Sequence, residues 1–335
     1  MGEPHVLDGD LAHDPQPRPS SLLSLFAIPL GVAGLAGVWQ ALRDNDSAPG
    51  WPAETFFAIS ATLWFGLSLT YLVIRGRGRG NFTADRTHSV FGPFAAYLPV
   101  VGLLISSHYV QYLPAARVVV ALFVAALAYL VAQLVAYWLL GNLPAEALHP
   151  GYFLPTVAGA FIASIGLSFC GWPHAAMASF GVGIFFWLAI GTLIFNRLFT
   201  GPALPDSVKP TLSVLLSAPA TAGIAWFLLN GAAVDTIAQL LLGVLAIMLA
   251  VQVVLIAEYR ALSFSQGFWA FTFPVAASSN LVIRTLGATD WAPAGIGMWV
   301  IGSAATIFIA TMTVASVIHA VRGARATATP TMSTR

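Results

Sequence analysis

The sequence contains very little charge. Only 8% of its 335 residues are Asp, Glu, Lys or Arg, whereas a soluble domain carries about 25%. Apolar residues make up 58%, and a soluble fold of this length cannot bury so many, because much of any globular surface still contacts water. The net charge of +1 indicates neither a nucleic-acid partner nor an acidic ligand. The composition therefore predicts an integral membrane protein with the lipid bilayer as its surroundings.

Cysteine is almost absent as well. The single residue, Cys170, excludes an internal disulfide, a CxxC redox pair and a thiolate metal cage. The seven histidines show no HxxxH or HExxH spacing. His108 and His319 lie near the ends of apolar segments, where a solvated or interfacial histidine is expected. Without a base paired to a nucleophile, the sequence predicts no enzyme activity, no cofactor and no metal site.

Charged residues mark where the chain can leave the bilayer, because a hydrocarbon core of about 30 Å takes roughly 20 apolar helical residues to cross. Reading from charge to charge predicts ten helices, at residues 21–42, 56–74, 91–108, 117–140, 153–170, 176–196, 211–230, 237–257, 266–286 and 294–321. Residues 1–20 are polar and lack the basic segment of a signal peptide, so they are predicted to form a disordered cytoplasmic tail. The predicted organisation is this tail, a ten-helix membrane domain over 21–321 and a cytoplasmic C-terminal tail over 322–335.

The distribution of Arg and Lys predicts the orientation. With both termini in the cytoplasm, 11 basic residues lie on that side and only Arg43, Arg117 and Arg284 on the other. Positive residues accumulate on the cytoplasmic side of membrane proteins. The sequence thus predicts a multi-pass protein of the cell (inner or plasma) membrane with both termini inside.

Proline occurs in a regular pattern along these segments. Every odd-numbered span has an internal proline, and no even-numbered span has one; the five are Pro29, Pro99, Pro155, Pro219 and Pro274. Proline removes a backbone donor and kinks a helix, and in a membrane the freed carbonyl is tolerated where protein or water satisfies it. We therefore expect an all-α fold of five hairpins, with the proline-kinked helices inside around a central pore. Prolines are also common in membrane helices without any function, which is the alternative interpretation.

Acidic residues are missing from the interior of every predicted span. Ion-coupled pumps and carriers place ionisable groups at mid-membrane, because something must bind and release the coupling ion. A pathway without carboxylates also does not repel anions. The sequence therefore favours a neutral route for the passive movement of an anion or an uncharged solute.

Several stretches, in order along nearly the whole chain, resemble the tellurite-resistance/C4-dicarboxylate transporter family, which includes TehA-type and plant slow anion channels. They are Phe26-Ala-Ile-Pro-Leu-Gly-Val-Ala-Gly-Leu35, Phe153-Leu-Pro-Thr-Val-Ala-Gly159, Gly183-Ile-Phe-Phe-Trp-Leu188, Leu204-Pro-Asp-Ser-Val-Lys-Pro-Thr-Leu212 and Phe268-Trp-Ala-Phe-Thr-Phe-Pro274. The resemblance implies ten helices in five hairpins, a pore in each protomer and a homotrimer. It also implies that Phe273, directly before the proline of the ninth span, occludes the pore; the residues alone favour a packed ring there.

Three functions follow as hypotheses. The first is a channel or facilitator for a small anion (chloride, nitrate, sulfite or a C4-dicarboxylate) with a neutral pore gated by Phe273. The second is a proton-gradient-linked exporter of sulfite, dicarboxylate or tellurite-related anions, against which the missing carboxylates count. The third is a membrane scaffold or sensor that transports nothing.

Overall fold

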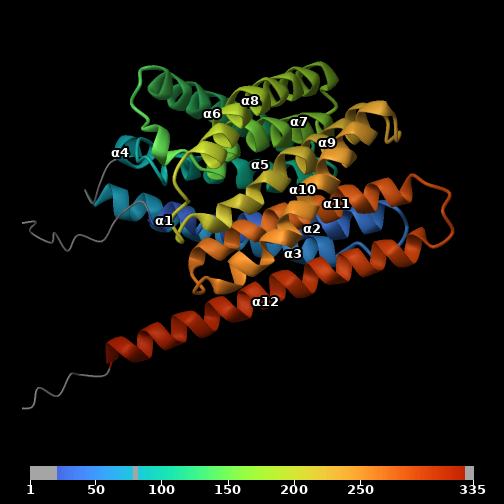
Figure 1. The fold of residues 1–335 in the computed structure, drawn as a ribbon. Coiled ribbons are helices and arrows are strands. Elements are labelled where there is room, and N and C mark those ends of the chain that lie inside the picture. The colour runs from blue at the N-terminus through green and yellow to red at the C-terminus, as the bar shows by residue number, and fades with distance from the viewer. Residues whose placement is uncertain (1–20, 78–81, 329–335) are drawn as a thin grey trace, which may run out of the picture.

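The computed structural model describes residues 21–77 and 82–328, so the predicted tail over 1–20 lies outside the described residues, as does the end of the chain from residue 329. All regular structure in the described part is helical. The α-helices are α1 (Ser21–Ser24), α2 (Ala27–Asp44), α3 (Trp51–Gly76), α4 (Phe82–Arg86), α5 (Tyr97–Tyr109), α6 (Ala116–Leu139), α7 (Gly159–Phe169), α8 (Pro173–Thr200), α9 (Ser217–Leu229), α10 (Thr236–Ala261), α11 (Thr272–Gly287) and α12 (Ala294–Ala328). Figure 1 shows α12 along one edge of the molecule, with α6 and α8 at the opposite edge.

Eight helical stretches of the described chain are long and apolar enough to cross a membrane. They correspond to eight of the ten predicted spans. The other two predicted spans, 91–108 and 266–286, contain the shorter helices α5 and α11, of 13 and 16 residues. Each of these follows directly on a tighter 3₁₀ segment, Gly92–Ala96 or Gln266–Phe271. The protein is thus an all-helical, multi-pass membrane protein.

The predicted odd and even spans differ in regularity. The even spans are uninterrupted α-helices: α3, α6, α8, α10 and α12. The odd spans change helix type near their prolines. Pro29, Pro99, Pro219 and Pro274 each occupy the third position of an α-helix, after a turn or a 3₁₀ segment, and Pro155 lies in the π-helical segment Leu154–Ala158. Each proline thus marks an irregular point in its span, as the missing N–H dictates.

The two sets also differ in burial. In the proline-containing spans Leu22–Asp44, Pro150–Phe169 and Lys209–Leu229, 67%, 89% and 72% of the most apolar stretch is buried. In α3, α6, α8, α10 and α12 the buried share is only 11–22%. The irregular helices therefore form the interior, and the continuous helices present apolar side chains to the outside.

Contacts among the interior helices follow a cyclic order. Helix α2 packs against α5 and α11, α5 against α7, α7 against α9, and α9 against α11. Each of them also packs against the helix that follows it in the chain: α3, α6, α8, α10 or α12.

Glycine allows α2 and α11 to pack closely. A Cβ added to Gly31 would overlap the Thr272 hydroxyl and lie 2.7 Å from its Cβ. A Cβ on Gly34 would lie 2.9 Å from the Ala276 Cβ. The small residues Gly31 and Gly34 therefore bring the α2 backbone against α11, as small residues do between membrane helices.

Candidate functional site

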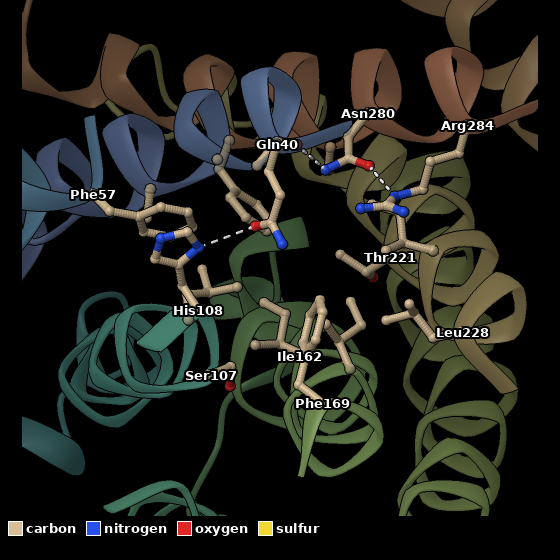
Figure 2. Close-up of a pocket in the computed structure, with 18 residues that line it drawn as sticks. Gln40, Phe57, Ser107, His108, Ile162, Phe169, Thr221, Leu228, Asn280 and Arg284 are labelled. Carbon is tan, nitrogen blue, oxygen red and sulfur yellow. Dashed lines mark hydrogen bonds between the residues drawn. The ribbon is translucent and has the colours of Figure 1, made fainter. Parts of the chain in front are cut away.

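A cavity lies among the five interior helices. Its volume is about 60 Å³, counted as the space open to the centre of a water molecule. It is lined by Ala33, Gly34, Gly37 and Gln40 of α2, Leu104, Ser107 and His108 of α5, Ile162, Ile165 and Phe169 of α7, Thr221, Ile224 and Leu228 of α9, Phe273, Ala277, Asn280 and Arg284 of α11, and Phe57 of α3. Figure 2 shows these side chains converging on one space.

A second, smaller cavity of about 20 Å³ is lined by the beginnings of the same helices. Its walls include Ala27 and Leu30 of α2, Tyr97 of α5, Ser217 of α9 and Pro274 of α11. Phe273 lines both cavities. The aromatic side chain singled out in the sequence thus belongs to both walls.

The environment of Phe273 is apolar and closely packed. The residue is 7% exposed, and a Cβ added to Gly34 would approach its Cδ2 atom to 3.1 Å. Pro274, the next residue, has no N–H to donate to the Ala270 carbonyl one turn earlier, and the Ser213 hydroxyl lies 3.0 Å from that carbonyl and 2.8 Å from the Pro210 carbonyl, between which it shares its proton. The irregular backbone beside the ring is therefore stabilised from a neighbouring segment.

Arg284 stands at the end of the larger cavity, in the last turn of α11. Its Nε donates to Asn280 Oδ1 at 2.8 Å, and its Nη2 lies 3.3 Å from Asp44 Oδ2. The Asp44 carboxylate also pairs with Arg43 at 2.9 Å. The Arg284 side chain, 13% exposed, is thus held in position with its guanidinium at the cavity wall (Figure 2).

His108 lines the same end of the cavity from α5. Its ring stacks on Phe57 with centroids 3.9 Å apart, and its Nε2 lies 3.0 Å from the Glu54 carboxylate. Its Nδ1 lies 3.4 Å from Gln40 Oε1. The Tyr112 hydroxyl donates to Glu54 at 2.7 Å, and this hydrogen bond raises the pKa of the Tyr112 phenol.

Two predictions from the sequence are wrong at this end of the cavity. His108 is 2% exposed and its Nε2 lies within hydrogen-bond distance of Glu54, so it is a buried residue and not a solvated one. The larger cavity is also not lined by neutral residues alone, because Arg284 contributes to its wall. Both residues lie near span ends, where polarity alone predicts contact with water. The one signal in the sequence was Arg284 itself, a cation inside the limits of the ninth predicted span.

The comparisons with known proteins give a family of anion channels. The family described as SLAC1, voltage-dependent anion channel, matches residues 22–321. A tellurite resistance protein TehA homolog of Haemophilus influenzae is 23% identical over 257 residues, which cover 76% of this chain and 78% of that protein.

Two plant proteins are also similar. The guard cell S-type anion channel SLAC1 of Arabidopsis thaliana is 24% identical over 318 residues, 89% of this chain and 55% of its own length. The S-type anion channel SLAH3 of the same plant is 23% identical over 312 residues, 89% of this chain and 48% of its own length. The chain thus spans about half the length of these plant relatives. Because the family match extends from α1 to α12, the chain belongs to the SLAC1/TehA family of voltage-dependent anion channels.

Proposed function

We propose that the protein is a channel or facilitator that conducts small anions along the two cavities, with the Phe273 ring as the gate between them. The observation that carries this proposal is that Phe273 lines both cavities. Membership of an anion-channel family, and not of an enzyme family, gives the class of solute.

The pore in this proposal is the axis of the interior helices. The cyclic contacts of α2, α5, α7, α9 and α11 support it, as does the low burial of the helices that follow them. Five hairpins, each of an irregular inner helix and a continuous outer one, give this arrangement if α5 and α11 cross the bilayer with their 3₁₀ segments. The five prolines then lie along the pore-lining helices, where freed carbonyls can be satisfied.

The gate acts by excluding water. An apolar ring in a narrow passage creates a dry constriction, and an ion that crosses it must lose hydration. Each 1.4 kcal/mol of such a barrier slows passage about tenfold. The Phe273 ring packs against Gly34 of α2 and closes the path by its size, without carrying a charge.

The test is anion flux from proteoliposomes. Phe273→Ala is expected to raise chloride and nitrate efflux about tenfold or more. Phe271→Ala is the matched control, because Phe271 lies on the same segment but lines an outer groove and neither of the two cavities. Equal flux in wild type and in folded Phe273→Ala rejects the gate; no flux in either favours a scaffold or sensor.

A proton-gradient-linked exporter is the second candidate. The observation that favours it is that His108, a titratable residue, lines the cavity and lies 3.0 Å from the partly exposed Glu54 carboxylate outside it, since a titratable group in the path is what proton coupling requires. Reversal potentials measured against a pH gradient separate the two functions. A shift that follows the proton gradient, and its loss in His108→Gln, indicates the exporter; independence from pH indicates the channel.

We also propose a homotrimer in the cell (inner or plasma) membrane with both termini in the cytoplasm. The exposed apolar faces of α3, α6, α8, α10 and α12 provide surface for lipid and for neighbouring subunits. Light scattering of the purified protein, corrected for detergent, tests the trimer. Cysteine accessibility in intact cells tests the orientation: a cysteine at position 206 should be protected and one at position 290 labelled.

A further inference from the structure

Most polar side chains that line the larger cavity already have hydrogen-bond partners. The hydroxyls of Ser107 and Thr221 each donate at 2.6 Å to a backbone carbonyl one turn earlier in their own helices. The amide nitrogen of Asn280 donates to the Gly37 carbonyl at 2.8 Å. The Asn280 oxygen accepts from Arg284. These groups stabilise the wall and are not organised for a ligand.

Two donors differ from the rest. A guanidinium has five N–H groups, but within the described part of the chain Arg284 bonds only through Nε and Nη2, which leaves Nη1 without an acceptor. Gln40 is 6% exposed, and its one side-chain hydrogen bond to a described residue joins its oxygen to His108 Nδ1 at 3.4 Å. Because an amide oxygen can only accept, Nδ1 is the donor in this bond, and the Gln40 amide nitrogen is left without a partner among the described residues. In Figure 2 the Gln40 amide group projects from α2 into the space between His108 and Arg284.

The charges at this end are also arranged by sign. Arg43, Asp44, Glu54, His108 and Arg284 form one connected network. Of its five members only His108 and Arg284 line the cavity, and Arg43 and both carboxylates lie outside its wall. The C-terminal ends of the interior helices gather on the same side and contribute partial negative charge, so a cation directed inward is needed to make this end attractive to an anion.

We propose that the cavity binds one small inorganic anion, a halide or a monovalent oxyanion such as nitrate, between the Arg284 guanidinium and the Gln40 carboxamide. A volume of about 60 Å³ holds a few water molecules, and therefore a small anion that keeps part of its hydration. The two unused donors supply the charge-assisted and neutral hydrogen bonds. This inference rests on the proposed function, in which the site loads anions on the Arg284 side of Phe273.

Binding is tested without transport. The purified full-length protein in detergent is unfolded thermally in increasing sodium bromide or sodium nitrate, with sodium gluconate keeping the ionic strength constant. A ligand that binds only the folded state raises the melting temperature in a saturable way. We expect bromide and nitrate to stabilise the wild type.

Two variants and one control assign the site. Arg284→Gln and Gln40→Glu are expected to raise the half-saturating concentration at least about tenfold; Gln40→Glu keeps an oxygen next to His108, which preserves the fold contact. Arg43→Gln removes a charge from the same network but not from the cavity wall, so it should keep the wild-type concentration dependence. Unchanged saturation in Arg284→Gln or Gln40→Glu, or an equal loss in Arg43→Gln, overturns the site.

The two proposals fail in different ways. Saturable stabilisation that depends on Arg284 and Gln40, together with no flux even in Phe273→Ala, supports the binding site and refutes the channel. Flux that rises in Phe273→Ala, together with no stabilisation by either anion, supports the channel and refutes the site.

Discussion

The acid sensitivity of the fold is predicted to depend on His149, which precedes the fifth predicted span. The residue is 2% exposed. Its Nε2 lies 3.0 Å from the Val90 carbonyl, to which it donates a hydrogen bond, and its Nδ1 accepts from the Gly151 backbone N–H at 3.1 Å. These two bonds require the neutral ring, because protonated Nδ1 has no lone pair to accept with.

Burial lowers the pKa of His149 from 6.5 to about 4. Because the folded-state pKa is the lower one, the unfolded chain takes up the proton first as the pH falls. The stabilisation is therefore complete above pH 6.5 and is lost progressively between about pH 6.5 and 4. The linkage relation gives a loss of about 2 kcal/mol between pH 7.5 and 5 and about 3 kcal/mol in full.

The assay is thermal unfolding in detergent at pH 7.5, 6 and 5 for wild type and His149→Asn. Asparagine keeps an acceptor for the Gly151 N–H in this turn but does not titrate. The variant is expected to be less stable at pH 7.5, because it loses the bond to Val90, yet to lose about 2 kcal/mol less than wild type on acidification to pH 5. Parallel loss of stability in both proteins refutes the reasoning.

Three further predictions concern packing and the gate. Gly31→Ala should destabilise the protein by about 1–3 kcal/mol in thermal unfolding, because its methyl group would overlap the facing hydroxyl on α11; wild-type stability would contradict this. Gly34→Ala should lower anion flux by pushing on the Phe273 ring, and the effect should vanish in the Phe273→Ala background. Tyr71→Phe should cost about 1–3 kcal/mol, because it removes a 2.6 Å hydrogen bond to the buried Asp85 carboxylate; an unchanged melting temperature counts against it.

Much of the fold follows from where charge and proline fall. The absence of charge within long apolar segments predicted the membrane spans, and proline separated the interior spans from the outer ones. The predicted first and last residues of the spans were less accurate, because local backbone geometry decides where a helix begins and ends. The seventh span begins as a 3₁₀ segment, Lys209–Leu216, and α12 continues to Ala328, past the predicted end at residue 321. Hydropathy does not distinguish 3₁₀ from α-helix, since it records only how apolar a segment is.

The candidate site was predictable only in part. Phe273 came from the resemblance, because an apolar ring next to a proline is more often a packing residue than a gate. The sequence did not predict that one cavity brings together Gln40, His108 and Arg284. Each lies near the end of a predicted span, where a polar residue is expected to lie at the membrane interface. Their burial depends on α2, α5 and α11 meeting, a property of the tertiary structure that spacing along one segment does not contain.

The most direct test of the central claim is chloride and nitrate efflux from proteoliposomes for a graded series at the gate. The account predicts that flux rises from wild type to Phe273→Leu and further to Phe273→Ala, while Phe271→Ala stays at the wild-type rate. Flux that does not depend on the size of residue 273, in variants that remain folded, would contradict it.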